Sequence, residues 1–117
     1  MNVTNAEEEE NVTMNVIINN SNYTIELVSE EEMNKEADNE DTLGLTIFKE
    51  QRILLVRDQA NMTKTLIHEL MHAWLYEYGH NAQDKQFNQE DVCEIVASAY
   101  RFIYNTIQDF TECKNLL

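Results

Sequence analysis

Hydrophobic and polar residues alternate in two pairs of short runs in the first half of the chain. Residues 12–18 and 23–28 are rich in β-branched and other apolar side chains and flank the polar stretch 19–22. Residues 43–48 and 52–58 form a second pair around a short polar connection. Apolar runs that alternate with a period of two, separated by polar turns, are typical of strands joined as hairpins. We therefore predict two β-hairpins.

The second half of the chain has a helical period instead. Between residues 61 and 78, apolar side chains recur three or four positions apart, which predicts a long helix with one buried face. These apolar positions are Leu66, Ile67, Leu70, Met71, Trp74, Leu75 and Tyr78. Asn61 or Thr63 can cap the start of this helix, and Gly79 can adopt the left-handed conformation that ends it.

A final helix is predicted to begin after Asn88, a residue type that caps helix starts well. Glu90 and Asp91 follow in the first turn, where the helix dipole favours acidic side chains. The stripe expected to be buried consists of Val92, Ile95, Val96, Ala99, Phe102, Ile103, Ile107 and Phe110. Both helices are therefore expected to pack through one apolar face.

The order of these elements predicts the fold class. Strands come first and two helices follow, which indicates an α+β domain with the helices on one face of a small, largely antiparallel sheet. Residues 30–41 are highly charged and are interpreted as either a short solvated helix or a loop. Residues 1–11 are polar and acidic, and we expect them to be disordered. Residues 12–117 then form a single domain, as the length of the chain suggests.

The first of the two helices carries the pattern His-Glu-x-x-His at residues 68–72. His68 and His72 are four positions apart, so on a helix both imidazoles lie on one face, where they can hold one metal ion. Glu69 lies beside that position, where a carboxylate can take a proton from a zinc-bound water. The alternative is a pair of core histidines on an amphipathic helix. The motif in its helical setting favours a zinc site with Glu69 as the catalytic base.

A catalytic zinc usually has three protein ligands, so the sequence must supply one more. His80 has the right side chain, but it comes only eight positions after His72 and would require a sharp reversal of the chain. Glu90 is the better candidate, because eighteen positions separate it from His72 and leave room for a turn. Glu94, one helical turn further, can accept a hydrogen bond from the outer nitrogen of a ligand histidine. Without a metal, Glu90 would be a helix N-terminal acid and Glu94 an exposed helix residue.

Residues 65–73 and 89–94 together resemble the corresponding segments of gluzincin metallopeptidases. In its small size the chain is similar to the minigluzincins and to the ImmA/IrrE-like proteins of bacteria and phages. In these families a His-Glu-x-x-His helix precedes a helix with the pattern Glu-x-x-x-Asp or Glu-x-x-x-Asn. The first acid of that second helix binds zinc, and the residue four positions on supports a ligand histidine. The resemblance covers roughly residues 43–100, and the preceding residues carry no signature of the family.

The resemblance implies a zincin-like fold and a zinc metallopeptidase of phage or bacterial type. It implies that His68, His72 and Glu90 bind Zn²⁺ and that Glu94 supports a histidine, although the family usually has Asp or Asn at that position. Glu69 would then act as the general base that activates the zinc-bound water for hydrolysis of a peptide bond. The expected substrate is a protein or a peptide.

The charge of the chain limits its partners. The formal net charge is −14 at pH 7, with acidic runs at residues 7–10 and 30–32. This charge disfavours nucleic acid and anionic membrane surfaces and favours a basic substrate or partner, although acidic runs also serve simply as solvated loops. The longest aliphatic run, residues 53–56, is far too short to cross a membrane, and the first residues do not resemble a secretory signal. We expect a cytoplasmic protein, of an oligomeric state that the sequence leaves open.

Two other functions remain open beside peptidase activity. The chain could be a catalytically inactive zincin-like module that binds a partner, although such a module has no need of Glu69. It could also be an acidic decoy that sequesters a basic DNA-binding protein, a reading that rests on charge alone and leaves the His-Glu-x-x-His pattern unexplained.

Overall fold

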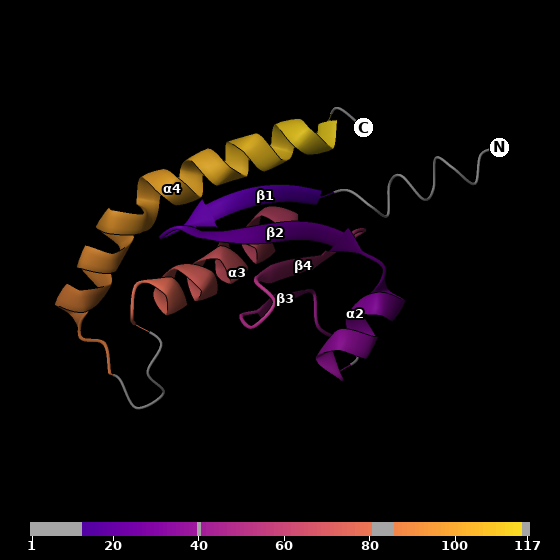
Figure 1. The fold of residues 1–117 in the computed structure, drawn as a ribbon, viewed down its shortest axis with the longest axis horizontal. Helices are drawn as coiled ribbons and strands as arrows, with labels where there is room; N and C mark the ends of the chain where they lie inside the picture. Colours follow the sequence, from indigo (N-terminus) through magenta and orange to yellow (C-terminus); the bar gives the residue numbers. More distant parts are fainter. Residues whose placement is uncertain (1–12, 40, 81–85, 116–117) are drawn as a thin grey trace.

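The structure, a computed structural model, describes residues 13–39, 41–80 and 86–115 (Figure 1). The segment 1–11, for which we predicted disorder, lies outside the described residues. In chain order the described elements are β1 (Thr13–Ile18), β2 (Ser21–Val28), α2 (Glu30–Ala37), β3 (Gly44–Ile47), β4 (Arg52–Val56), α3 (Met62–Glu77) and α4 (Gln89–Asn115). Both hairpins and both long helices therefore form where the periodicity predicts them.

The four described strands form one mixed sheet in the order β1-β2-β4-β3. β1 pairs antiparallel with β2, and β3 pairs antiparallel with β4, as two hairpins require. The central pair, β2 and β4, is parallel, with Leu27 opposite Leu55. A parallel pair requires a crossover, and α2 and β3 provide it here by returning the chain to the starting end of β2. The α+β class is confirmed, but the sheet is mixed, with two hairpins joined by a parallel central pair.

The first hairpin turns over two residues, whereas the sequence suggested a polar connection of four. Asn19 has φ of 48° and Asn20 has φ of 71°, so both are left-handed. Two consecutive left-handed residues are the mark of a type I′ turn, whose twist matches that of the adjoining strands. Asparagine tolerates this conformation better than most residues. Ser21 and Asn22 consequently belong to β2, and Ser21 pairs with Ile18.

One face of the sheet is covered by α3 and α4 (Figure 1). Successive strand residues point to opposite faces, so every second residue of β1, β2 and β4 contributes to the core on this side. That core contains Ile18, Tyr23, Ile25, Leu27, Ile53 and Leu55 from the strands, Leu66, Leu70 and Ala73 from α3, and Phe110 from α4. The α3 helix is thereby fixed flat against the sheet.

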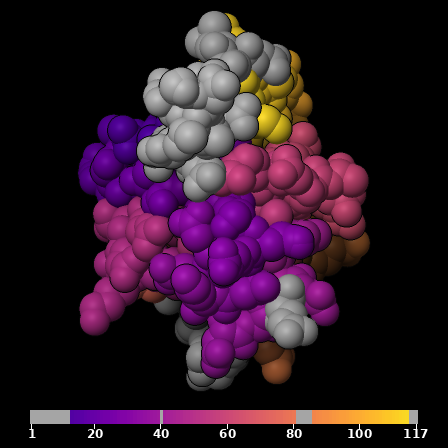
Figure 2. Space-filling view, turned by 90° about the vertical axis from the view of Figure 1, so that its right-hand side faces the viewer, coloured from indigo at the N-terminus to yellow at the C-terminus, as the bar shows by residue number. Residues whose placement is uncertain are grey.

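The opposite face is covered in part by α2, which lies on the side that faces the viewer in Figure 2. The Ser29 hydroxyl accepts a hydrogen bond from the Glu32 backbone N–H at 3.1 Å, and the Glu32 carboxylate accepts one from the Ser29 N–H at 3.4 Å. This reciprocal cap starts a helix in a stretch otherwise dominated by repelling acids. Met33 is fully buried in a second core cluster with Leu54 of β4. The two predicted helices, α3 and α4, therefore share one face as expected, and residues 30–37, interpreted as a solvated helix or a loop, form a helix that covers the other face through Met33.

α4 begins at a cap formed by Asn88, as predicted. The Asn88 side-chain oxygen accepts a hydrogen bond from the Asp91 N–H at 2.7 Å. Only the later turns of α4 pack fully on the sheet, because its first turns extend past the end of β1 (Figure 1). Val92 and Val96, which we predicted to be buried, are 49% and 54% exposed, whereas Ala99 is buried. The first part of the predicted stripe is therefore covered only in part, because the end of α3 lies across a cavity from it.

The end of α3 is tied to the first hairpin by the carboxylate of Glu77. Its two oxygens accept hydrogen bonds from the Ser21 hydroxyl at 2.8 Å and from the Tyr23 hydroxyl at 2.7 Å. The Asn19 side-chain amide donates to the Glu77 backbone carbonyl at 2.9 Å. Burial, together with the neighbouring Glu77 carboxylate, raises the pKa of Tyr23 above its ordinary value of 10.0.

Within the described ranges, no helix is long and apolar enough to cross a membrane.

Candidate metal centre

The His-Glu-x-x-His motif lies in the middle of α3, and the helix separates its residues onto two sides. Leu66, Leu70 and Ala73 are buried against the sheet, whereas His68 and His72 are exposed. Successive residues turn by about 100° around a helix axis, so the two histidines share a face that is turned away from the core. The interpretation of His68 and His72 as core histidines is therefore wrong.

The two imidazoles converge on one point. The Nε2 atoms of His68 and His72 are 3.1 Å apart, and the two rings meet edge to face with centroids 4.7 Å apart. Two Zn–N bonds of about 2.0–2.1 Å at a tetrahedral angle place their nitrogens about 3.3–3.4 Å apart. The pair would need to open by only a few tenths of an ångström to hold a zinc ion. In the absence of a metal the same distance suits a hydrogen bond between the rings.

Glu69 lies in the gap between α3 and β3, where it lines the same surface cavity as His68, and is only 7% exposed. The hydroxyl of Thr46 on β3 lies 2.7 Å from the Glu69 Oε1 atom and 3.1 Å from its backbone oxygen. A hydroxyl has one proton, so the shorter contact to the carboxylate is the stronger bond. This hydrogen bond holds the Glu69 carboxylate against β3, at the edge of the sheet. Glu69 directly follows His68 in the chain.

Gly44 allows β3 to approach this closely. A Cβ atom at this position would lie 2.5 Å from the Thr65 methyl group and 3.0 Å from Cγ of Glu69. The approach is held by Gln59, whose side-chain amide donates to the backbone oxygens of Leu43 at 3.0 Å and Val56 at 2.9 Å. Thr65 in turn donates to the Gln59 side-chain oxygen at 2.7 Å. One glutamine thus links the residue before β3, the end of β4 and the first turn of α3.

A surface cavity of about 340 Å³ opens beside the motif, between α3 and the start of β3. Its lining includes Leu43 and Gly44 from one side and Lys64, His68 and Glu69 from the other. β3 is an edge strand, so one row of its backbone N–H and C=O groups is not used by the sheet. The cavity therefore places the exposed edge of a strand next to an imidazole and a positioned carboxylate.

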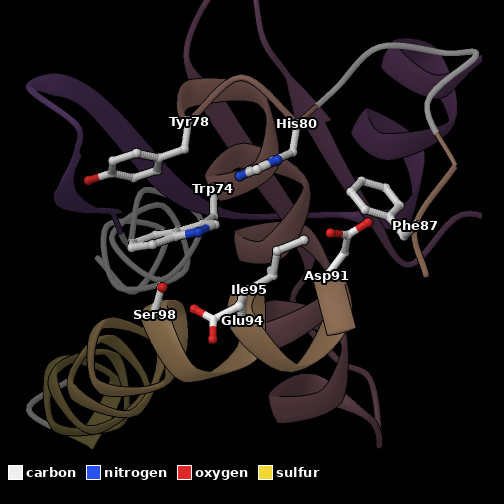
Figure 3. A pocket seen from close by; sticks show the side chains of 8 residues that line it. All are labelled: Trp74, Tyr78, His80, Phe87, Asp91, Glu94, Ile95 and Ser98. Carbon is white, nitrogen blue, oxygen red and sulfur yellow. The ribbon is translucent and has the colours of Figure 1, made fainter. Parts of the chain in front are cut away.

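The other predicted site residues lie elsewhere. Glu90 is exposed in the first turn of α4, and Glu94 and His80 line a separate cavity against Trp74 (Figure 3). Trp74 follows His72 by two positions, which places it about 200° further around α3, nearly on the opposite side of the helix. Within the described residues, no group of three or more His, Cys, Asp or Glu side chains could hold a metal ion. The structure thus brings His68 and His72 together and leaves Glu90, Glu94 and His80 apart from them.

Sequence reasoning did not identify Gly44 and Thr46. Both occupy alternate positions of a predicted strand, so the period of two would have placed them on one face. A glycine and a threonine on the face of a strand that meets a helix signal a close approach and a hydrogen bond. Asp41, which also lines the cavity beside His68, was read only as part of a charged segment.

Comparison of the chain with protein-family models, with curated proteins and with solved structures yields no match.

Proposed function

We propose that this protein is a zinc-dependent metallopeptidase. The observation that carries the proposal is the convergence of His68 and His72, 3.1 Å apart at Nε2, next to a buried Glu69 held by Thr46. Two imidazoles and a carboxylate on adjacent faces of one helix are the donors and the base that zinc-assisted hydrolysis requires. A histidine pair with a purely structural role would not need a carboxylate oriented in this way.

The residues would divide the work as follows. Zn²⁺, when bound by the two histidines, lowers the pKa of a water molecule and polarises a carbonyl group. The Glu69 carboxylate accepts one proton of the attacking water, whose oxygen bonds to the carbonyl carbon. The peptide C–N bond then breaks, and Glu69 returns the proton to the leaving nitrogen. Thr46 supports this role by holding the carboxylate in one orientation.

The exposed edge of β3 supports a peptide as the substrate. An extended peptide can add to an edge strand through backbone hydrogen bonds, which need no particular side chains. Leu43 and Gly44 border the same cavity as His68 and Glu69, so a peptide paired there would pass beside the motif. The net charge of −14 favours a basic segment.

Glu90 remains our predicted third ligand, but it lies in the first turn of α4 and in this structure does not join His68 and His72. Its carboxylate would have to approach the pair to bind the same ion. Asp41 is a second candidate, because it lies on the histidine side of α3 as part of the cavity lining. Elemental analysis of the purified protein and its Glu90→Ala and Asp41→Ala variants separates the two. Zinc lost with only one of them identifies the ligand, and His80→Ala, which alters a histidine outside the pair, should retain the metal.

Glu69→Gln tests the activity itself. Glutamine keeps the shape of the side chain and still accepts a hydrogen bond from Thr46, but it cannot act as a base. The parent should hold about one zinc per chain and cleave basic peptides from a library, and Glu69→Gln should keep zinc but lose at least about 100-fold in cleavage rate. Zinc without cleavage in the parent would support a binding module that does not cleave. Partner binding that needs no zinc and collapses at high salt would support the acidic decoy.

A further inference from the structure

A cavity of about 410 Å³ lies on the other side of α3 from the histidine pair. The end of α3 forms one wall and the first turns of α4 form the other (Figure 3). Trp74 and Tyr78 come from the first wall, Asp91 and Glu94 from the second, and Phe87 closes one side. The peptidase proposal assigns no role to these side chains at this cavity.

Aromatic rings make up much of the cavity. The rings of Trp74 and Tyr78 lie 4.3 Å apart at their centroids with an angle of 38° between their planes. Trp74 is held from behind by Phe102, at a centroid distance of 5.5 Å, so the indole is packed between two rings. Tyr78 and Phe87 are nevertheless 43% and 40% exposed. The ring of Tyr78, which lines the cavity, is therefore accessible to a ligand there.

Two carboxylates face these rings from α4. Asp91 and Glu94 are three positions apart on the helix, so they lie on the same face and both reach the cavity (Figure 3). Asp91 accepts a hydrogen bond from the Asn88 backbone N–H at 3.1 Å, which fixes its carboxylate. In the described part of the chain, the ion pairs all involve Arg52, and none includes Asp91 or Glu94. Among the described residues the two carboxylates therefore have no ion-pair partner, and the His80 imidazole lines the same cavity.

We propose that this cavity binds the arginine side chain of a basic peptide or protein partner. A cation over an aromatic face is attracted by the negative potential of the ring, and the partly exposed ring of Tyr78 offers such a face beside Trp74. A guanidinium is planar and weakly hydrated, stacks on aromatic faces, and has five N–H donors with which it can reach two carboxylates at once. A lysine ammonium fits less well, because it is compact and strongly hydrated. An uncharged apolar ligand would cover the two carboxylates without a partner.

The single tryptophan of the chain reports directly on this cavity. Titration of the full-length protein with acetyl-Gly-Arg-Gly-amide should change the Trp74 emission along a saturable curve, with a dissociation constant on the order of 1 mM. The same peptide with citrulline in place of arginine has the same shape but no charge, and should give no saturable change. The lysine peptide should bind at least about fivefold more weakly. Equal curves for arginine and citrulline, or for arginine and lysine, would overturn the assignment of an arginine pocket.

Variants locate the binding site. Glu94→Gln should weaken binding of the arginine peptide about tenfold, because it removes a charge and keeps the size of the side chain. Asp109→Asn makes the same kind of change on an exposed residue of α4 outside the cavity, and should leave the dissociation constant unchanged. Circular dichroism of both variants establishes that α4 is intact. Equal binding by Glu94→Gln and the parent, with both folded, would refute the proposal whether or not the protein cleaves peptides.

Discussion

Gly44 offers a sharp test of how β3 is fitted against α3. In Gly44→Ala, the new Cβ would lie 2.5 Å from the Thr65 methyl group, about 0.9 Å closer than the 3.4 Å at which ordinary contact begins. Thr65 cannot easily turn away, because it is β-branched and its hydroxyl is bonded to Gln59 at 2.7 Å. Either the strand or the helix must move, and such overpacking costs about 1–3 kcal/mol. We expect Gly44→Ala to lower the free energy of unfolding by about 2 kcal/mol.

The Thr65→Ser variant identifies the cause, since serine lacks the methyl group and keeps the hydroxyl. Alone it should cost at most about 0.8 kcal/mol, the value of one buried methyl group. In the Thr65→Ser background, Gly44→Ala should cost less than about 1 kcal/mol, which leaves a coupling of at least about 1 kcal/mol. The measurement is urea unfolding followed by circular dichroism, with equal m-values across the four proteins.

Gly79→Ala is the matched control. Gly79 has φ of 82° and no atom within 4 Å of a Cβ at that position, so alanine would strain the backbone without a clash. Its cost of about 1 kcal/mol should be the same with threonine or serine at position 65. If Gly44→Ala also costs the same in both backgrounds, the contact with Thr65 is not the reason for a glycine at position 44.

Three further variants test other contacts. Tyr23→Phe removes a hydroxyl whose pKa is raised in the folded state. Above pH 10 the folded parent keeps this proton, whereas the unfolded chain has lost it. In urea titrations the parent should therefore lose stability as the pH rises beyond 10, and the variant should not. Thr46→Val leaves the buried Glu69 carboxylate without this donor and should cost about 1–3 kcal/mol of unfolding free energy, recovered by Thr46→Ser. Ser29→Ala removes the cap of α2 and should cost about 1 kcal/mol in the same measurement, whereas a neutral effect would mean that the cap is not formed in solution.

Periodicity predicted the local structure of this chain well because it depends on neighbours in the sequence. The alternation in β1 and β2 and the three-to-four spacing in α3 gave the positions of these elements to within a few residues. The Asn88 cap was identified from residue type alone, and the structure confirms it. The helical spacing of His68 and His72 was likewise enough to predict that their side chains meet.

What the sequence could not predict depends on segments far apart in the chain. The parallel pairing of β2 with β4 is decided by the path of the connection, which periodicity does not report. Val92 and Val96 lie on the apolar face of α4, but a stripe says which side of a helix is apolar and not whether anything lies opposite. The same limitation applies to Glu94, because its surroundings depend on where α4 crosses α3. The structure places Glu94 at the same cavity as Trp74.

The mixed sheet has a consequence for the order in which the chain folds. Each hairpin joins neighbours in the sequence, as the pairings of Ile18 with Ser21 and of Ile47 with Arg52 show. The parallel pairing joins Thr24 to Arg52 and closes a loop that contains α2 and β3. Closing a long loop costs entropy before its contacts form, and non-local pairing slows folding. The two hairpins should therefore form early, and the pairing of β2 with β4 should be the rate-limiting step. Core substitutions in β2 and β4 should then slow folding more than core substitutions in β1 and β3.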